Sequence, residues 1–243
     1  MTWPFRGSTR PWIYGHRGVR DTAPENTMPA FELALQRGAD GIEFDVQVSC
    51  DGQAVVFHDA TLERMTSGRD CRSVSGLSER ELCSIRLEGG ALVPRLQDVL
   101  YWANGNALYL NIELKCTGHE IATLLTAVER EISAIAARSL QERIVISSFS
   151  RDAISLVNTR GWPWKSAQLF DRDEPIEMVQ VASIGSHPHF SSVRNTIDQS
   201  ADRSGFVNVW TVNDADTARR LNALGVDGII TDEIALVFEA LNG

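Results

Sequence analysis

The stretch GIEFDVQV, residues 41–48, is a strand-like apolar run interrupted by two acids. Comparable runs recur along the chain, at 12–14, 54–57, 107–114, 143–149, 166–170, 181–185, 205–210 and 227–231. Segments with helical periodicity lie between most of them, at about 28–37, 95–104, 119–138, 151–160, 174–180, 214–224 and 233–241. This alternation predicts parallel strands joined by helical crossovers, which is the α/β class.

Two α/β architectures compete for this pattern, the closed eight-fold barrel and the open doubly wound sheet. If the run at 54–57 pairs with the strand before it or extends that unit, the number of strand–helix units is close to eight. The first strand is not followed by GxGxxG, which disfavours a dinucleotide-binding open sheet. A length of 243 residues is typical of one barrel. We therefore predict a (β/α)8 TIM barrel in which residues 1–243 form a single domain.

One region interrupts the alternation of strands and helices. Residues 59–94 contain no long periodic segment and are rich in Ser, Gly, Arg and Glu. So long an irregular excursion inside a compact domain is typical of an added segment rather than a simple connection. We predict a small insertion after strand 2.

Composition limits the partners and the compartment. The formal net charge is −9 and the isoelectric point is near 5.1, so a long polyanion such as DNA meets a repulsive field. The sequence has no apolar window of membrane-helix length and no apolar signal-peptide core near its start. Four cysteines without CxxC spacing predict free thiols. We expect a cytoplasmic protein, a monomer or a homodimer, that binds a small molecule, with no nucleic acid and no stable membrane association.

Acidic side chains interrupt two of the strand-like runs. Glu43 and Asp45 lie two positions apart in one run, and Glu113 lies two positions before Lys115 in another. Residues two apart on a strand point to the same face, so each pair converges. Three carboxylates from two strands form a hard oxygen cage that suits one divalent cation, Mg²⁺ or Ca²⁺, rather than Zn²⁺. The alternative is that an acid pairs with an arginine or caps a backbone group.

Further polar residues follow the ends of strand-like runs, where a barrel carries its active site. His16 and Arg17 follow the first run, and His58 ends the run at 54–57. The ordinary imidazole pKa near 6.5 suits proton transfer at neutral pH, so the two histidines are candidates for general acid and base. Arg17 can bind two phosphate oxygens at once, and Lys115 can supply a point charge. Inert loop histidines and surface ion pairs are the alternatives.

Several later residues are weaker candidates. Trp210 ends a strand-like run and is either core filling or one wall of a pocket. His187 and His189 follow the strand expected at 181–185, where they border the pocket or are ordinary loop residues. Asn213 and Asp214 are expected to cap the helix that follows them.

Seven motifs then occur in a fixed order along nearly the whole chain. They are HRG (16–18), APENT (23–27), GADGIEFDVQVSCDG (38–52), VVFHDATLERMTSG (55–68), NIELK (111–115), WTVN (210–213) and GVDGIITD (225–232). Each motif alone is moderately informative, whereas the ordered set is specific. The set resembles the glycerophosphodiester phosphodiesterase family, and is most similar to its short soluble bacterial members.

The resemblance implies a (β/α)8 barrel with an insertion after strand 2, and a phosphoric diester hydrolase of lipid and glycerol metabolism. It also implies a role for each matching residue of this chain: metal carboxylates Glu43, Asp45 and Glu113; acid and base His16 and His58; phosphate contacts Arg17 and Lys115; and, near the glycerol end, Trp210. The cation in the family is Mg²⁺ or Ca²⁺.

Three local departures from the family pattern leave its charged groups in place. Cys116 and Ile234 stand where prolines are common, and SCDG (49–52) replaces the more usual TxDG. The departures therefore concern loop shape rather than chemistry.

The implied reaction is metal-dependent hydrolysis of a glycerophosphodiester, such as glycerophosphocholine or glycerophosphoethanolamine, to sn-glycerol 3-phosphate and an alcohol. The nucleophile is water, or the neighbouring glycerol hydroxyl with a cyclic phosphate formed first. The alternatives are a lysophospholipase D or phospholipase D activity on the same barrel, and a catalytically silent binder of phosphate esters.

Overall fold

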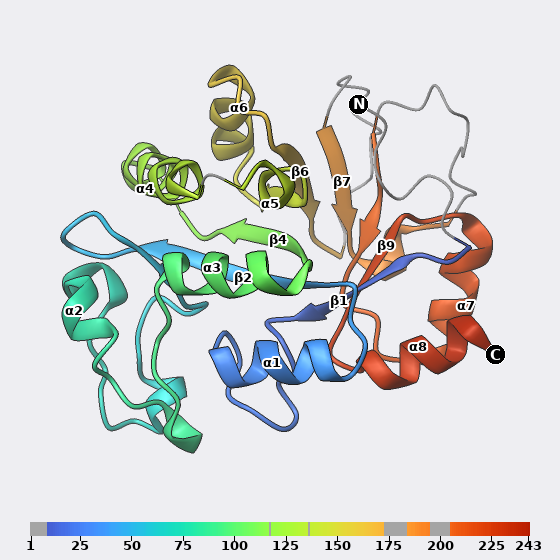
Figure 1. The fold of residues 1–243 in the computed structure, drawn as a ribbon, viewed down its shortest axis with the longest axis horizontal. Coiled ribbons are helices and arrows are strands. Elements are labelled where there is room, and N and C mark those ends of the chain that lie inside the picture. The colour runs from blue at the N-terminus through green and yellow to red at the C-terminus, as the bar shows by residue number, and fades with distance from the viewer. Residues whose placement is uncertain (1–8, 117, 136, 173–183, 195–204) are drawn as a thin grey trace.

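The computed structural model describes residues 9–116, 118–135, 137–172, 184–194 and 205–243, which form parallel strands surrounded by helices (Figure 1). Within these ranges eight strands pair in parallel, in the order β7-β6-β5-β4-β2-β1-β9-β8. Their bounds are Trp12–His16 (β1), Gly41–Val48 (β2), Tyr109–Leu114 (β4), Ile144–Ser148 (β5), Lys165–Phe170 (β6), Ile184–Pro188 (β7), Asn208–Val209 (β8) and Gly228–Thr231 (β9). The predicted TIM barrel is confirmed.

The ring of strands closes between β7 and β8 through isolated bridges. Ser186 bridges Val207, and the Ser186 amide donates to the Phe206 carbonyl at 2.8 Å. A second bridge joins His189 to Trp210. Of the strand expected at 205–210, only the two residues of β8 form a regular strand. The barrel is therefore nearly closed, with isolated bridges in place of a continuous ladder between β7 and β8.

The pairing expected for the run at 54–57 is also confirmed. β3 (Ala54–Val56) pairs antiparallel with β2 and lies off the path of the eight parallel strands. In the turn between them the Ser49 amide donates to the Gln53 carbonyl at 2.9 Å, and Gly52 has φ of 74°, which glycine adopts without a steric penalty. This hairpin leads the chain from β2 into the insertion.

The insertion lies between β3 and α3 (Leu96–Asn106), at one side of the barrel (Figure 1, teal). Its regular elements are short: η1 (Arg64–Thr66), η2 (Val74–Gly76), α2 (Glu79–Leu82) and η3 (Glu88–Gly90). Elements of this length leave no periodic signal in a sequence. They enclose an apolar cluster of their own, formed by Val55, Phe57, Leu62, Met65, Val74, Leu77, Leu82, Leu87 and Val93.

The remaining helices pack around the ring, and their buried faces join the outer faces of the strands in one main core. They are α1 (Met28–Gln36), α3, α4 (Glu120–Ala134), α5 (Arg138–Gln141), α6 (Arg151–Thr159), α7 (Ala215–Leu224) and α8 (Ile234–Asn242). Phe31 and Phe44 are fully buried there, and each such side chain stabilises a fold by about 1.5–3 kcal/mol.

Individual helix predictions differ in outcome. Asp214 caps α7 as expected, because its carboxylate accepts from the Thr217 amide at 2.8 Å. The helix expected at 119–138 is interrupted, since α4 ends at Ala134 and the next residue is extended. The helix expected at 174–180 lies outside the described residues. Among the helices that the structure does describe, none has the length and apolarity needed to cross a bilayer.

Candidate active site

Three carboxylates from the neighbouring strands β2 and β4 meet in one cluster. The strands are adjacent, and their register places Asp45 opposite Glu113. Glu43 and Asp45 alternate with the core residue Phe44, as the two-residue period of a strand requires. One oxygen from each of the three acids lies within 4.8 Å of the others, and all three side chains are buried. The convergence expected from the i, i+2 spacing is present.

Burial and the charges of neighbouring groups shift the pKa values of all three carboxyl groups. Burial, followed by the charges of Asp45 and Glu113, raises the pKa of Glu43 well above its ordinary value. Burial and the Asp45 charge also raise the pKa of Glu113, to about 7. Burial opposes ionisation of Asp45 as well, but Lys115 and Arg17 outweigh it and hold the pKa of that carboxyl below its ordinary value. Protein cations therefore offset only part of the repulsion within the cluster.

The donor set of this cluster fits a hard divalent cation. All of its candidate ligands are carboxylate oxygens, which Mg²⁺ and Ca²⁺ prefer. Within the described residues, Glu43 Oε1 is buried and has no hydrogen-bond partner. A buried, unsatisfied carboxylate oxygen is costly unless a proton or a cation meets it.

Two cations flank the carboxylates. Arg17 Nε lies 3.1 Å from Asp45 Oδ2. Lys115 Nζ lies 3.2 Å from Asp45 Oδ1 and also pairs with Glu113. Both are placed to share the charge of an anion that binds beside the cluster.

The backbone of the HRG motif explains how Arg17 reaches this position. Arg17 has φ of 55°, a left-handed conformation that is uncommon for residues other than glycine. It is held there because the Arg17 amide donates to the Glu43 carbonyl at 2.8 Å. At Gly18, with φ of 86°, an added Cβ would lie 2.6 Å from the backbone of Ala30, so α1 packs against this turn only with glycine there.

Each of the two candidate histidines is held by an aspartate. His16 Nδ1 lies 2.8 Å from Asp232 Oδ1, and its Nε2 lies 4.0 Å from Glu43 Oε2. His58 Nδ1 lies 2.6 Å from Asp59 Oδ1. A carboxylate only accepts, so we assign the ring proton to Nδ1, which leaves Nε2 available for proton transfer. Burial lowers the pKa of His58 and so favours its neutral form.

Four supporting residues were given no role by the sequence: Asp59, Asp232, Glu25 and Asn26. Glu25 Oε1 accepts from Arg17 Nη1 at 2.9 Å. Asn26 donates to Asp45 Oδ2 at 2.8 Å and accepts from the Asp45 amide at 3.2 Å. A signal was available in each case, because Asp59 directly follows His58, Asp232 directly follows the last strand-like run, and the other two belong to APENT.

An aromatic wall lies beside Lys115. The Trp210 ring packs edge-on against Phe149 at 5.4 Å between centroids, and Trp210 Nε1 donates to the His187 carbonyl at 2.8 Å. Lys115 Nζ lies 5.7 Å from the Phe149 ring centre. Trp210 is half-buried and Phe149 is 41% exposed, so this wall faces accessible space rather than core.

The two weaker candidates, His187 and His189, lie in different environments. His187 lies on β7 rather than in the loop after it, so the expectation of a loop residue is wrong for this position. It is fully buried, its Nε2 lies 3.1 Å from Asn208 Nδ2, and burial lowers its pKa to about 3. His189 follows β7, and its ring lies 5.3 Å from Trp210, so it borders the aromatic wall.

A TIM barrel with three buried carboxylates, two aspartate-held imidazoles and two cations beside them is the arrangement expected of an enzyme that hydrolyses phosphate esters. Comparison with known proteins makes the assignment specific. The model of the glycerophosphoryl diester phosphodiesterase family matches residues 16–236, and this chain belongs to that family. Its enzyme class is therefore phosphoric diester hydrolase.

Individual relatives agree with this assignment. The glycerophosphodiester phosphodiesterase of Caldanaerobacter subterraneus subsp. tengcongensis is 31% identical over 230 residues, which cover 91% of this chain and 93% of the relative. The crystal structure of glycerophosphodiester phosphodiesterase from Agrobacterium tumefaciens superposes with a TM-score of 0.77 at 27% identity, over 96% of this chain and 100% of that one. A phosphodiesterase from Oleispira antarctica, in complex with the product sn-glycerol-3-phosphate, has a TM-score of 0.82 at 25% identity, over 96% and 98% of the chains.

Proposed function

We propose that this chain hydrolyses glycerophosphodiesters, such as glycerophosphocholine or glycerophosphoethanolamine, to sn-glycerol 3-phosphate and an alcohol. The observation that carries the proposal is the buried cluster of Glu43, Asp45 and Glu113 with Arg17 and Lys115 on its flanks. The product bound to the Oleispira antarctica relative supports the same substrate class.

Glu43, Asp45 and Glu113 would hold one divalent cation, Mg²⁺ or Ca²⁺. Such a cation acts as a Lewis acid that neutralises the charge developing on phosphoryl oxygens. The raised pKa values of Glu43 and Glu113 support this assignment, because a cation relieves the repulsion that raises them.

Arg17 and Lys115 would bind the non-bridging phosphate oxygens. Arg17 is held on two sides, by Glu25 and by Asp45, so its position is fixed before substrate binds. Preorganised charge of this kind stabilises a transition state without reorganisation at the moment of reaction. Lys115 shares its ammonium between Asp45 and Glu113, which ties the second phosphate contact to the acidic cluster.

His16 and His58 would carry the protons. One imidazole accepts a proton from the nucleophile, which is water or the neighbouring glycerol hydroxyl, and the other donates a proton to the leaving alcohol. In each case an aspartate on Nδ1 fixes the ring orientation and tautomer. Trp210 and Phe149 would contact the glycerol carbons, because they form the apolar face beside Lys115.

Several broader expectations stay predictions from the sequence. These are the single-domain assignment of residues 1–243, the monomeric or dimeric state and the lack of stable membrane association. A cytoplasmic location is supported by four free cysteines, since free thiols are typical of reducing compartments.

Turnover of glycerophosphocholine tests the proposed function. The wild type is expected to release glycerol 3-phosphate, and His16→Ala, His58→Ala and exhaustive chelation are each expected to remove that activity. Full activity in either variant, or activity that survives chelation, would contradict the mechanism. A lysolipid assayed in parallel distinguishes the proposed glycerophosphodiesterase from a lysophospholipase D, which would prefer the lipid. Binding of glycerophosphocholine in calorimetry without any turnover would indicate a catalytically silent binder.

A further inference from the structure

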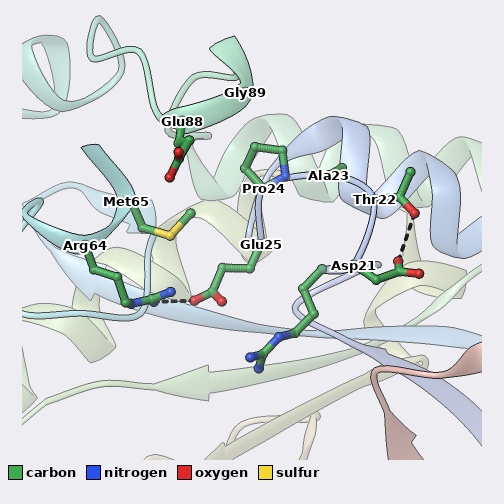
Figure 2. Close-up of a pocket in the computed structure, with 10 residues that line it drawn as sticks. Asp21, Thr22, Ala23, Pro24, Glu25, Arg64, Met65, Glu88 and Gly89 are labelled. Atoms are coloured by element: carbon green, nitrogen blue, oxygen red, sulfur yellow. Dashed lines mark hydrogen bonds and ion pairs between the residues drawn. The ribbon is translucent and has the colours of Figure 1, made fainter. Parts of the chain in front are cut away.

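Arg64, in η1 of the insertion, bonds to two carboxylates that border the active site. Arg64 Nε lies 2.6 Å from Asp59 Oδ2, and Arg64 Nη2 lies 3.1 Å from Asp59 Oδ1. The same Nη2 lies 2.6 Å from Glu25 Oε1. Figure 2 shows the guanidinium facing Glu25 beside the pocket between the APENT loop and the insertion. The volume of this pocket is about 400 Å³. One guanidinium therefore bridges two carboxylates.

Each of these carboxylates holds a residue of the site. Asp59 binds His58 Nδ1 at 2.6 Å. Glu25 Oε1 binds Arg17 Nη1 at 2.9 Å. A continuous chain of ion pairs and hydrogen bonds thus runs from the His58 imidazole through Arg64 to the Arg17 guanidinium.

We propose that Arg64 is a positioning residue for phosphodiester hydrolysis, which orients His58 through Asp59 and Arg17 through Glu25. The proposal rests on the proposed function of the site. Arg64 bonds to the supporting carboxylates, and those carboxylates bond in turn to the groups that meet substrate. The insertion is then a working part of the site rather than an attachment to it.

Charge explains why a cation is required at this point. Asp59 and Glu25 are two like charges brought to one guanidinium, and without it they would repel each other and turn toward water. Burial opposes ionisation of Asp59, but the hydrogen bonds from Arg64 and His58 hold its pKa below the ordinary value. An ionised Asp59 is the form that accepts from His58 Nδ1.

The fork of arginine explains why lysine would not replace it fully. Arg64 uses two nitrogens on Asp59 and shares one of them with Glu25, which fixes direction as well as charge. The two residues that follow Arg64 in η1 hold its backbone in place. Met65 packs in the apolar cluster of the insertion, and Thr66 Oγ1 donates to the Leu62 carbonyl at 2.9 Å.

The test compares Arg64→Ala and Arg64→Lys with Arg72→Ala as a matched control. Arg72 is an exposed arginine of the same insertion that pairs with Asp70, away from the site. We expect kcat for glycerophosphocholine to fall about 10- to 100-fold in Arg64→Ala, with a smaller loss in Arg64→Lys. KM should change by less than about threefold, and Arg72→Ala should match the wild type. If Arg64→Ala does not fold, the kcat of Arg64→Lys decides.

Two further readouts separate positioning from simple stabilisation. Guanidinium ion, at concentrations far below denaturing ones, is expected to restore part of the kcat of Arg64→Ala, because the cavity beside it admits a small cation. In an Asp59→Asn background, removal of Arg64 should reduce kcat less than it does in the wild type, since part of its action passes through Asp59.

Three results would overturn the inference: an unchanged kcat in Arg64→Ala, an equal loss in Arg72→Ala, or an Arg64→Ala effect that is as large in the Asp59→Asn background as in the wild type. A wild type that hydrolyses no glycerophosphodiester would instead overturn the proposed function, so the two failures are distinguishable.

Discussion

Replacing Asp232 with asparagine perturbs His16 through a residue that lies 216 positions away in the sequence. Asp232 binds His16 Nδ1 at 2.8 Å through Oδ1, and Asn213 Nδ2 donates to its Oδ2 at 2.7 Å. An amide in its place has one oxygen, and the Asn213 donor requires that oxygen. The new amide nitrogen would then face His16 and donate to Nδ1. The ring proton moves to Nε2, the nitrogen that lies 4.0 Å from Glu43.

An imidazole held in this tautomer has no free nitrogen on the substrate side. The analogous change in a serine protease triad costs about 10⁴ in rate, and we expect about 10²–10⁴ here, or about 3–5 kcal/mol of activation free energy. The KM for glycerophosphocholine should change by less than about threefold, since the role proposed for His16 is proton transfer rather than binding of the phosphate. A coupled assay for released glycerol 3-phosphate gives both constants.

Asp216→Asn is the matched control for this substitution. Asp216 is an exposed acid of α7 that pairs with Arg219, so its loss should leave kcat unchanged. Thermal melting of both variants checks that the barrel is intact. A folded Asp232→Asn variant with kcat within about threefold of the wild type would refute the positioning of His16 by Asp232.

Three further predictions concern stability and binding. Burial lowers the pKa of His187 to about 3, whereas the unfolded chain binds that proton near pH 6.5, so the free energy of unfolding should fall as pH drops from 6.5 toward 3, by up to about 5 kcal/mol. Urea titrations should show a smaller pH slope in His187→Gln, and equal slopes would contradict this. Gly18→Ala, which forces a Cβ to within 2.6 Å of Ala30, should lower the free energy of unfolding by about 2–4 kcal/mol. Gly68→Ala, which also has positive φ but open space around it, should lose only about 1 kcal/mol in the same denaturation experiment, and equal losses would rule out the close approach as the cause. Trp210→Ala should raise KM for glycerophosphocholine about fourfold to fifteenfold, as expected when one or two glycerol carbons lose an apolar contact of about 0.8 kcal/mol each, and an unchanged KM would remove Trp210 from the substrate site.

The acidic cluster could be predicted from the sequence because its cause is local. Residues two positions apart on a strand point to the same face, so Glu43 and Asp45 converge wherever their strand lies in the fold. Adjacent parallel strands then brought Glu113 beside them. The TIM barrel followed from the same kind of evidence, since the alternation of strand-like and helical segments is read directly along the chain.

The supporting residues could not be placed in the same way, because barrel closure decides them. Asp232 reaches His16 only because β9 pairs with β1, which brings together the first and last strands along the described residues. Arg64 reaches Glu25 because a segment without periodicity folds onto the loop after β1. The prediction of His187 as a loop residue was wrong for a related reason. The strand runs to Pro188, so His187 lies within it and is buried.

Reactivation of the chelated protein tests whether Glu43, Asp45 and Glu113 hold the cation on which the proposed phosphodiester hydrolysis depends. Chelated enzyme is titrated with Mg²⁺ or Ca²⁺ while glycerophosphocholine hydrolysis is followed. We predict that activity returns with one ion bound per chain, and that Glu113→Gln shifts the half-saturating ion concentration upward by at least about tenfold. Full activity without added ion, or an identical ion dependence in Glu113→Gln, would contradict the account.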